Sequence, residues 1–399
     1  MSKLLGCCGG RLLSVAWIVL LGCGGSGAAD STTTTSTTDT GEASTAASAD
    51  DTLGPPTGTT DGPGTTGVDG GSTRGSESEG SGSSTGEEPP EPLDLPPADP
   101  PVPVPPGTLH SVDIPCGPYP ETAFDVFLPP SDQPTPMVVF IHGGGFTGGD
   151  KSAAYGGQTA LEITALLEAG VAFATIDYRL LQTVDDEGVI KPLGDSRYCL
   201  QFMRYHAASL NLDEARIGAY GGSAGAGTSL WLGTHDDMAD PGSPDPVERR
   251  STRLRAVGLR ETQATYDVIR WLDEIFAPYG ITLDMIIMAG LEQRLLSFYG
   301  IDSIAELDTP PIVAYRDDVD MLDLMDGSDA PIWIHSQNQP EAFPTDTGSL
   351  FHHPYHAQAV MEEALAKGVE QVSYIPVLGI EDPSGETLVE FMLRHLEVR

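Results

Sequence analysis

Apolar and polar positions alternate with two different periods over the last three quarters of the chain. Residues 137–141 are an uninterrupted apolar run, as in a strand that is buried on both faces, and another buried strand is expected at residues 171–176. Further buried strands are expected at residues 217–220, 254–259, 332–335 and 372–377. Between them, apolar residues recur at helical spacing over residues 161–170, 196–210, from 224 onward, 355–366 and 384–396. We therefore predict strands and helices in alternation.

This alternation predicts the layers of the fold. Strands that alternate with helices form a mostly parallel central sheet with helices on both faces. Residues 110–114 and 122–128 instead alternate apolar with polar side chains, which predicts an antiparallel edge. Residues 260–308 break the pattern, and we expect a small cap insertion there. Residues 108–399 are thus predicted to form one α/β domain.

The first 107 residues have a different texture. Lys3 and Arg11 precede the apolar run 12–21, which is too short to span a bilayer and has the length of a signal-peptide core. Residues 24–107 are rich in Thr, Ser, Gly and Asp, and then in Pro. Such a segment buries too little apolar surface to offset the entropy of ordering. We predict a signal peptide at 1–22 and a disordered acidic linker at 23–107.

The end of the leader suggests an anchor. Leu20-Leu21-Gly22-Cys23 resembles the lipobox of bacterial lipoproteins. The resemblance implies cleavage before Cys23 and acylation of this residue, with several acyl chains giving stable attachment to the membrane. Gly24 after the cysteine favours the outer membrane in the Gram-negative members of that family. An ordinary secretory signal is the alternative.

Charge and cysteine content restrict the partners. The formal net charge of −38 opposes binding to phosphate backbones, so we expect no nucleic-acid partner. No CxxC pair or Cys/His cluster at metal spacing occurs, and we expect no metal and no cofactor. In the predicted domain, Cys116 and Cys199 either form a disulfide or are two buried thiols.

A GxSxG motif, Gly221 to Gly225, lies between a predicted strand and a predicted helix. A tight turn in this position needs small neighbours, because it holds a serine in a strained conformation with its hydroxyl exposed. A second motif, His142-Gly143-Gly144-Gly145, directly follows the strand that ends at residue 141. Its glycines let backbone N–H groups approach a developing oxyanion. Both motifs follow buried parallel strands, where such sheets place active sites.

These residues carry a family resemblance. Residues 140–146, 149–151, 176–180 and 221–225 are similar to α/β-hydrolase esterases and lipases with an HGGG loop, the hormone-sensitive-lipase-like and feruloyl- or acetyl-esterase-like carboxylesterases. The resemblance covers residues 108–399. It implies that Ser223 attacks an ester carbonyl and that the N–H groups of Gly144, Gly145 and Ala224 hold the oxyanion. It also implies that His142 supports the loop and is not the base.

The chain departs from the family pattern at the other two triad positions. The family places its acid after the seventh strand, where this chain has Gln339, and its histidine after the eighth, where this chain has Ile380. A serine without a base is a poor nucleophile at neutral pH. A relocated base is therefore sought between the seventh strand and the next helix: His353 is the first choice, His352 the second, and Asp346 the orienting acid. Glu381 and Asp382 are further candidate acids.

Two functional hypotheses follow. The first is a lipid-anchored serine hydrolase that cleaves a small carboxylic ester through an acyl-enzyme on Ser223. The second is a non-catalytic binding domain that has kept the serine turn and lost the proton relay. Aromatic and Met side chains of the insertion could line an acyl pocket, or could simply pack a helix face: Trp271, Phe276, Met285, Met288, Phe298 and Tyr299.

Overall fold

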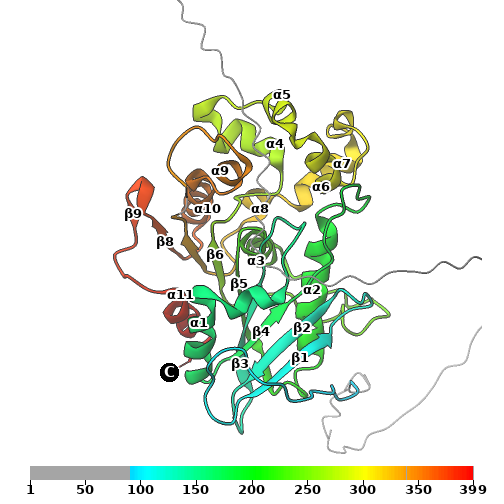
Figure 1. Cartoon of the computed structure of the whole chain (residues 1–399), viewed down its shortest axis with the longest axis vertical. Helices are drawn as coiled ribbons and strands as arrows, with labels where there is room; N and C mark the ends of the chain where they lie inside the picture. Colours follow the sequence, from blue (N-terminus) through cyan, green and yellow to red (C-terminus); the bar gives the residue numbers. More distant parts are fainter. Residues whose placement is uncertain (1–89, 338, 399) are drawn as a thin grey trace, which may run out of the picture. The chain divides into compact units, whose positions relative to one another are not determined.

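A central sheet organises the computed structural model, which describes residues 90–337 and 339–398 (Figure 1). Within this described part, nine strands lie in the order β1-β2-β4-β3-β5-β6-β7-β8-β9. Their bounds are β1 Leu109–Pro115, β2 Ala123–Leu128, β3 Thr135–Ile141, β4 Ala172–Ile176, β5 Leu212–Gly222, β6 Val257–Arg260, β7 Ile332–His335, β8 Gln371–Ile375 and β9 Ile380–Glu381.

The centre of the sheet is parallel and its two ends are antiparallel. Strands β4, β3, β5, β6, β7 and β8 run parallel to one another. The pairs β1–β2, β2–β4 and β8–β9 are antiparallel. Every residue of β3 and β4 is buried, as expected for strands that are covered on both faces. The predicted parallel sheet with an antiparallel edge is therefore confirmed.

Helices cover both faces of the sheet. Helices α1 (Gly157–Glu168) and α11 (Leu388–His395) share one apolar cluster, in which Ile163 and Phe391 pack with Phe173 of the sheet. Helices α2 (Ile190–Tyr205), α3 (Ala224–Thr234) and α10 (Pro354–Lys367) contribute to the larger cluster on the other face. Gly170 after α1 and Gly368 after α10 have positive φ, which agrees with their predicted role as helix terminators.

The cap insertion is longer than predicted, because β6 ends at Arg260 and β7 begins only at Ile332. It contains α4 (Val268–Arg270), α5 (Leu283–Ile286), α6 (Glu292–Tyr299), α7 (Pro310–Asp318) and α8 (Met321–Leu324), with π-helical turns at Trp271–Ile275 and Ile287–Leu291. A short helix α9 (Thr347–Phe351) follows β7. Helices α4 to α7 gather at one end of the sheet (Figure 1).

The proline-rich segment 90–107 differs from its prediction as linker. Val102 is buried against α1 and β4 residues in one of the two apolar clusters. The Ala98 N–H donates to the His110 carbonyl at 2.8 Å, and Ser111 Oγ donates to the Pro96 carbonyl at 2.8 Å. The domain boundary at residue 107 is therefore placed too late, because this segment pairs with β1 as a strap. The leader, Cys23 and the rest of the predicted linker lie outside the described residues.

Cys116, just after β1, and Cys199 in α2 form a disulfide. Of the two alternatives for this pair, the structure has the bridge. It ties the antiparallel edge of the sheet to a helix on its face. Among the helices of residues 90–337 and 339–398, none has both the length and the apolar content that crossing a bilayer requires.

Candidate active site

Ser223 occupies a strained turn between β5 and α3. Its φ is +53°, a conformation that side chains other than glycine rarely adopt. The Ser223 N–H donates to the Arg260 carbonyl at 2.8 Å, which ties the turn to the end of β6. A side chain at Gly221 or Gly225 would clash with the Ile141 carbonyl at the end of β3. The glycines of GxSxG are thus required because three backbone segments meet at this point.

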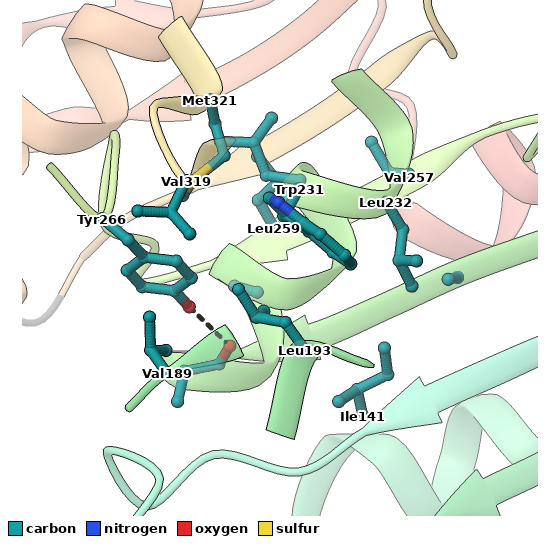
Figure 2. Packing of buried hydrophobic residues seen from close by; sticks show 14 of the residues in the cluster. Ile141, Val189, Leu193, Trp231, Leu232, Val257, Leu259, Tyr266, Val319 and Met321 are labelled. Atoms are coloured by element: carbon teal, nitrogen blue, oxygen red, sulfur yellow. Dashed lines mark hydrogen bonds between the residues drawn. The ribbon is translucent and has the colours of Figure 1, made fainter. Parts of the chain in front are cut away.

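The helix behind the serine is held from all sides. Every residue of α3 is buried, as expected for a helix that is surrounded by packing partners. The Tyr266 hydroxyl, from the cap insertion, donates to the Ala224 carbonyl at 2.9 Å in the first turn of α3. Figure 2 shows this bond together with Trp231 of α3 and with Val189 and Leu193, which belong to the same apolar cluster. The position of Ser223 is therefore fixed by the core and by the cap together.

The HGGG loop lies beside this turn. Gly144 and Gly145 have φ of +104° and +60°, values that favour glycine. The described residues offer no hydrogen-bond acceptor to the N–H groups of Gly144, Gly145 and Ala224. These donors are therefore free for a ligand. A helix N-terminus also favours negative charge near Ala224.

His142 supports this loop, as the resemblance implies. Its ring stacks on Tyr178 with 4.2 Å between centroids, and its Nδ1–H donates to the Gly143 carbonyl at 2.7 Å. The Tyr178 hydroxyl donates to the His142 carbonyl at 2.8 Å. Burial lowers the pKa of His142 despite the nearby Asp177, which keeps the ring neutral in its structural role.

A histidine does reach the serine. Ser223 Oγ lies 2.7 Å from Nε2 of His352, which follows α9. Ser223 and Phe351, the residue before His352, line a pocket whose wall is mostly apolar and includes cap side chains, among them Trp271 and Phe298. The wall is formed by Gly145, Phe146, Ser223, Ala224, Gln263, Tyr266, Val268, Trp271, Ile286, Leu291, Arg294, Leu295, Phe298, Leu350 and Phe351. A serine hydroxyl, an imidazole, free backbone N–H donors and a cavity therefore meet at one place.

Solved structures of the same architecture exist. A truncated carbohydrate esterase from gut microbiota aligns with a TM-score of 0.52 and 15% identity, over 72% of this chain and 96% of that one. The chain has the α/β-hydrolase fold. The bifunctional GH43-CE of Bacteroides eggerthii aligns with a TM-score of 0.50 and 18% identity, over 72% of this chain and 38% of that one. The acetyl ester-xyloside bifunctional hydrolase of Caldicellulosiruptor lactoaceticus aligns with a TM-score of 0.44 and 19% identity, over 67% of this chain and 81% of that one.

A family model adds a match at the sequence level. The model described as BD-FAE matches residues 124–272 of this chain, which is less than half of its 399 residues. The match begins in β2 and ends in the cap, so it includes the HGGG loop and the serine turn. No curated protein matches the sequence.

The expectation that His353 faces Ser223 is wrong. His353 is the N-cap of α10: its Nδ1 accepts from the Tyr355 N–H at 3.2 Å, and its Nε2 donates to the Ala342 carbonyl at 3.0 Å. Both ring nitrogens are thus engaged in holding the chain. His352, the second choice, is the residue at the serine.

The expectation that Asp346 orients the base is also wrong. Asp346 caps α9, and its Oδ1 accepts from the Ser349 N–H at 2.7 Å. Among the described residues, no carboxylate contacts His352 Nδ1, and burial alone shifts the pKa of His352, downward. The other candidates, Glu381 and Asp382, belong to β9 and the turn after it. The site is therefore a Ser–His pair without an acid among these residues.

Other polar residues hold the base in place, and sequence reasoning missed them. Gln263 Nε2 donates to the Phe351 carbonyl at 2.8 Å, next to His352. His356 Nε2 donates to the Leu350 carbonyl at 3.1 Å, while its Nδ1 accepts from the Ala264 N–H at 3.3 Å. Full burial lowers the pKa of His356 to about 3, so this ring is neutral.

The apolar residues predicted for an acyl pocket divide into several groups, and Met285 is half-buried. Trp271 and Phe298 line the pocket. Phe276 and Tyr299 are buried in the core, while Met288 is exposed to solvent. Periodicity alone could not separate these groups, because it reports which face of a helix is apolar and not what lies against it.

Proposed function

We propose that this chain is a carboxylic-ester hydrolase that works through an acyl-enzyme on Ser223. The observation that carries the proposal is the 2.7 Å separation between Ser223 Oγ, in a strained and half-buried turn, and His352 Nε2. Hydrogen-bond contact between a nucleophile and a base is the geometric requirement for activating a serine. The BD-FAE match, which includes Ser223 and ends before His352, supports the same reaction class.

The geometry suggests how each step proceeds. His352 Nε2 takes the hydroxyl proton of Ser223 as Oγ bonds to the ester carbonyl carbon. The resulting oxyanion accepts hydrogen bonds from the N–H groups of Gly144, Gly145 and Ala224. The imidazolium then gives its proton to the departing alcohol oxygen. Water repeats the sequence on the acyl-enzyme, with His352 as base, and releases the acid.

The absent carboxylate has a cost in this mechanism. A triad acid holds the histidine in the tautomer that can accept the serine proton, and it stabilises the imidazolium. His352 has neither benefit from the described residues. The bonds of Gln263 and His356 to the adjacent carbonyls restrict where the ring sits, which supplies part of the orienting role.

A fluorophosphonate probe tests the proposal directly. We expect covalent labelling of the wild-type protein and none of Ser223→Ala, with the labelled peptide identified by mass spectrometry. A folded wild-type domain that resists the probe, and that hydrolyses no 4-nitrophenyl ester, would instead favour the non-catalytic binding domain.

We further propose that Cys23 is acylated and that the anchor holds the domain at the bacterial outer membrane. The lipobox-like residues before Cys23 and the long polar linker after it support this location. Expression with an alkyne-tagged palmitate should label the wild-type chain in the membrane fraction. Cys23→Ser should remove both the label and the membrane association. A labelled Cys23→Ser chain would exclude this cysteine as the acylated residue.

A further inference from the structure

The wall of the active-site pocket contains one permanent charge among the described residues, the guanidinium of Arg294 on α6. Its Nη2–H donates to the Gly145 carbonyl at 3.0 Å. Its centre lies 5.0 Å from the centroid of the Phe351 ring, next to His352. The cation is therefore held between the HGGG loop and the residue that precedes the proposed base.

Arg294 has no carboxylate partner among the described residues. The other cap arginines do: Arg270 Nη1 lies 2.7 Å from Asp320, and Arg316 Nε lies 2.8 Å from Asp267. Their carboxylates raise the pKa values of Arg270 and Arg316, whereas burial alone acts on Arg294 and lowers its pKa. The guanidinium nonetheless stays charged, since its ordinary pKa is above 12.

A half-buried guanidinium without a carboxylate partner sets Arg294 apart from the other cap arginines, Arg270 and Arg316. The sequence has 58 acidic residues and 20 Lys and Arg residues, so carboxylates are abundant. Burial of a charge without a counter-ion is costly. A mere clamp on the Gly145 carbonyl needs one N–H donor, which a neutral amide would supply, but a guanidinium has five. Nε and Nη1 of Arg294 have no acceptor among the described residues and are not sealed from solvent.

We propose that Arg294 binds a carboxylate on the ester substrate, so that the enzyme prefers anionic esters. This proposal rests on the proposed function and names its substrate class. A planar fork of N–H donors matches a carboxylate, and the apolar wall around it strengthens the pairing. Because Arg294 touches Gly145, the substrate carboxylate would lie close to the oxyanion donors and hence to the scissile bond.

The test compares matched esters in the full chain. Mono-4-nitrophenyl glutarate and 4-nitrophenyl valerate share a leaving group and differ in a terminal carboxylate against a methyl group. We expect wild type to prefer the glutarate. In Arg294→Met the ratio of kcat/KM for glutarate over valerate should fall about 10- to 100-fold, as expected for the loss of a charge-assisted bond. Arg294→Lys keeps the charge without the fork and should lose less.

A second pair of esters places the carboxylate on the alcohol side. For 4-acetoxybenzoate against phenyl acetate, the same ratio is measured in the same variants. Dependence on Arg294 in either pair supports the proposal, and the pair that responds tells on which side of the scissile bond the carboxylate sits. Lys367→Gln removes one positive charge at the end of α10, outside the pocket wall, and should leave both ratios unchanged.

Ratios in Arg294→Met within about twofold of wild type for both pairs would overturn the proposal, while Ser223 labelling would leave the proposed hydrolase standing. If no ester is hydrolysed, binding decides. Calorimetry with monomethyl glutarate should detect binding to Ser223→Ala and none to Ser223→Ala/Arg294→Met. Absence of binding to Ser223→Ala would equally overturn the proposal.

Discussion

At the residue scale, His352 differs from the histidine of a triad because only one of its nitrogens has a partner among the described residues. Nε2 meets Ser223 Oγ at 2.7 Å, and no described carboxylate contacts Nδ1. Loss of a triad acid alone costs about 10⁴-fold in rate in well-studied proteases, so we expect a slow enzyme unless the substrate supplies extra binding energy.

The two adjacent histidines give a sharp test. His352→Ala should lower kcat/KM for 4-nitrophenyl acetate by about 10³-fold or more, because the serine loses its base. His353→Asn should stay within about tenfold of wild type, since asparagine can replace the N-cap of α10. Circular dichroism would verify that both variants fold. Equal losses in the two variants would contradict the assignment of the base.

The pH profile tests the surroundings of His352. The neutral imidazole is the active base, so activity falls as pH drops through its pKa. Burial lowers this pKa from the ordinary value of 6.5 and no anion opposes the shift. The acid limb of kcat/KM should therefore have its midpoint below pH 6.5. A midpoint above 6.5 would mean that a carboxylate does stabilise the imidazolium.

At the scale of elements, the site depends on three backbone segments in near contact. The N-terminus of α3 packs on the carbonyl end of β3, and the cap donates a hydroxyl to α3. The backbone segments are so close at this contact that a side chain at Gly221 or Gly225 would have no room. The glycines of GxSxG are therefore required for packing as much as for the proposed catalysis.

Two glycines of the same motif should respond differently. A methyl group at Gly225 would meet the Ile141 carbonyl, so Gly225→Ala should lower the free energy of unfolding by about 3 kcal/mol or prevent folding. A methyl group at Gly222 would instead enter open space, and the φ of Gly222 is not positive. Gly222→Ala should cost less than about 1 kcal/mol. Urea unfolding measures both, and similar values would refute this account of the turn.

The elements themselves were largely predictable, but the base was not. Buried parallel strands can be predicted from a local run of apolar residues, and β7 has the predicted bounds of residues 332–335. His352 and His353 instead differ by one position, which turns a side chain by about 100° around a helix axis. The ring that meets Ser223 is therefore decided by where α9 ends and where α10 begins. That boundary depends on capping by Asp346 and His353, which no apolar periodicity reveals.

Gln263 shows a second limit of sequence reasoning. Its amide reaches the Phe351 carbonyl, 88 positions along the chain, from a stretch without regular structure after β6. No motif surrounds it. Contacts of this kind follow from how the long cap folds back over the sheet, which local patterns do not determine.

At the scale of the whole molecule, the strap at residues 90–107 belongs to the folded unit. A chain that begins at residue 90 should be more stable than one that begins at 108. Burial of Val102 alone accounts for about 2 kcal/mol. Thermal unfolding of both chains, with Val102→Ala in the longer one as an intermediate case, measures the difference. Equal melting temperatures would mean that the strap contributes no net stability.

The position of His352 in the chain also has a consequence for the last two strands of the sheet. Since the imidazole comes from the connection between β7 and α10, neither β8 nor the two-residue β9 has a side chain to deliver to the serine. With His352 as the proposed base, the turn between β8 and β9 takes no part in proton transfer. An added loop or a fused module at residues 376–379 could be accommodated there without altering turnover, which makes this rim the natural place to attach a reporter or a second binding domain.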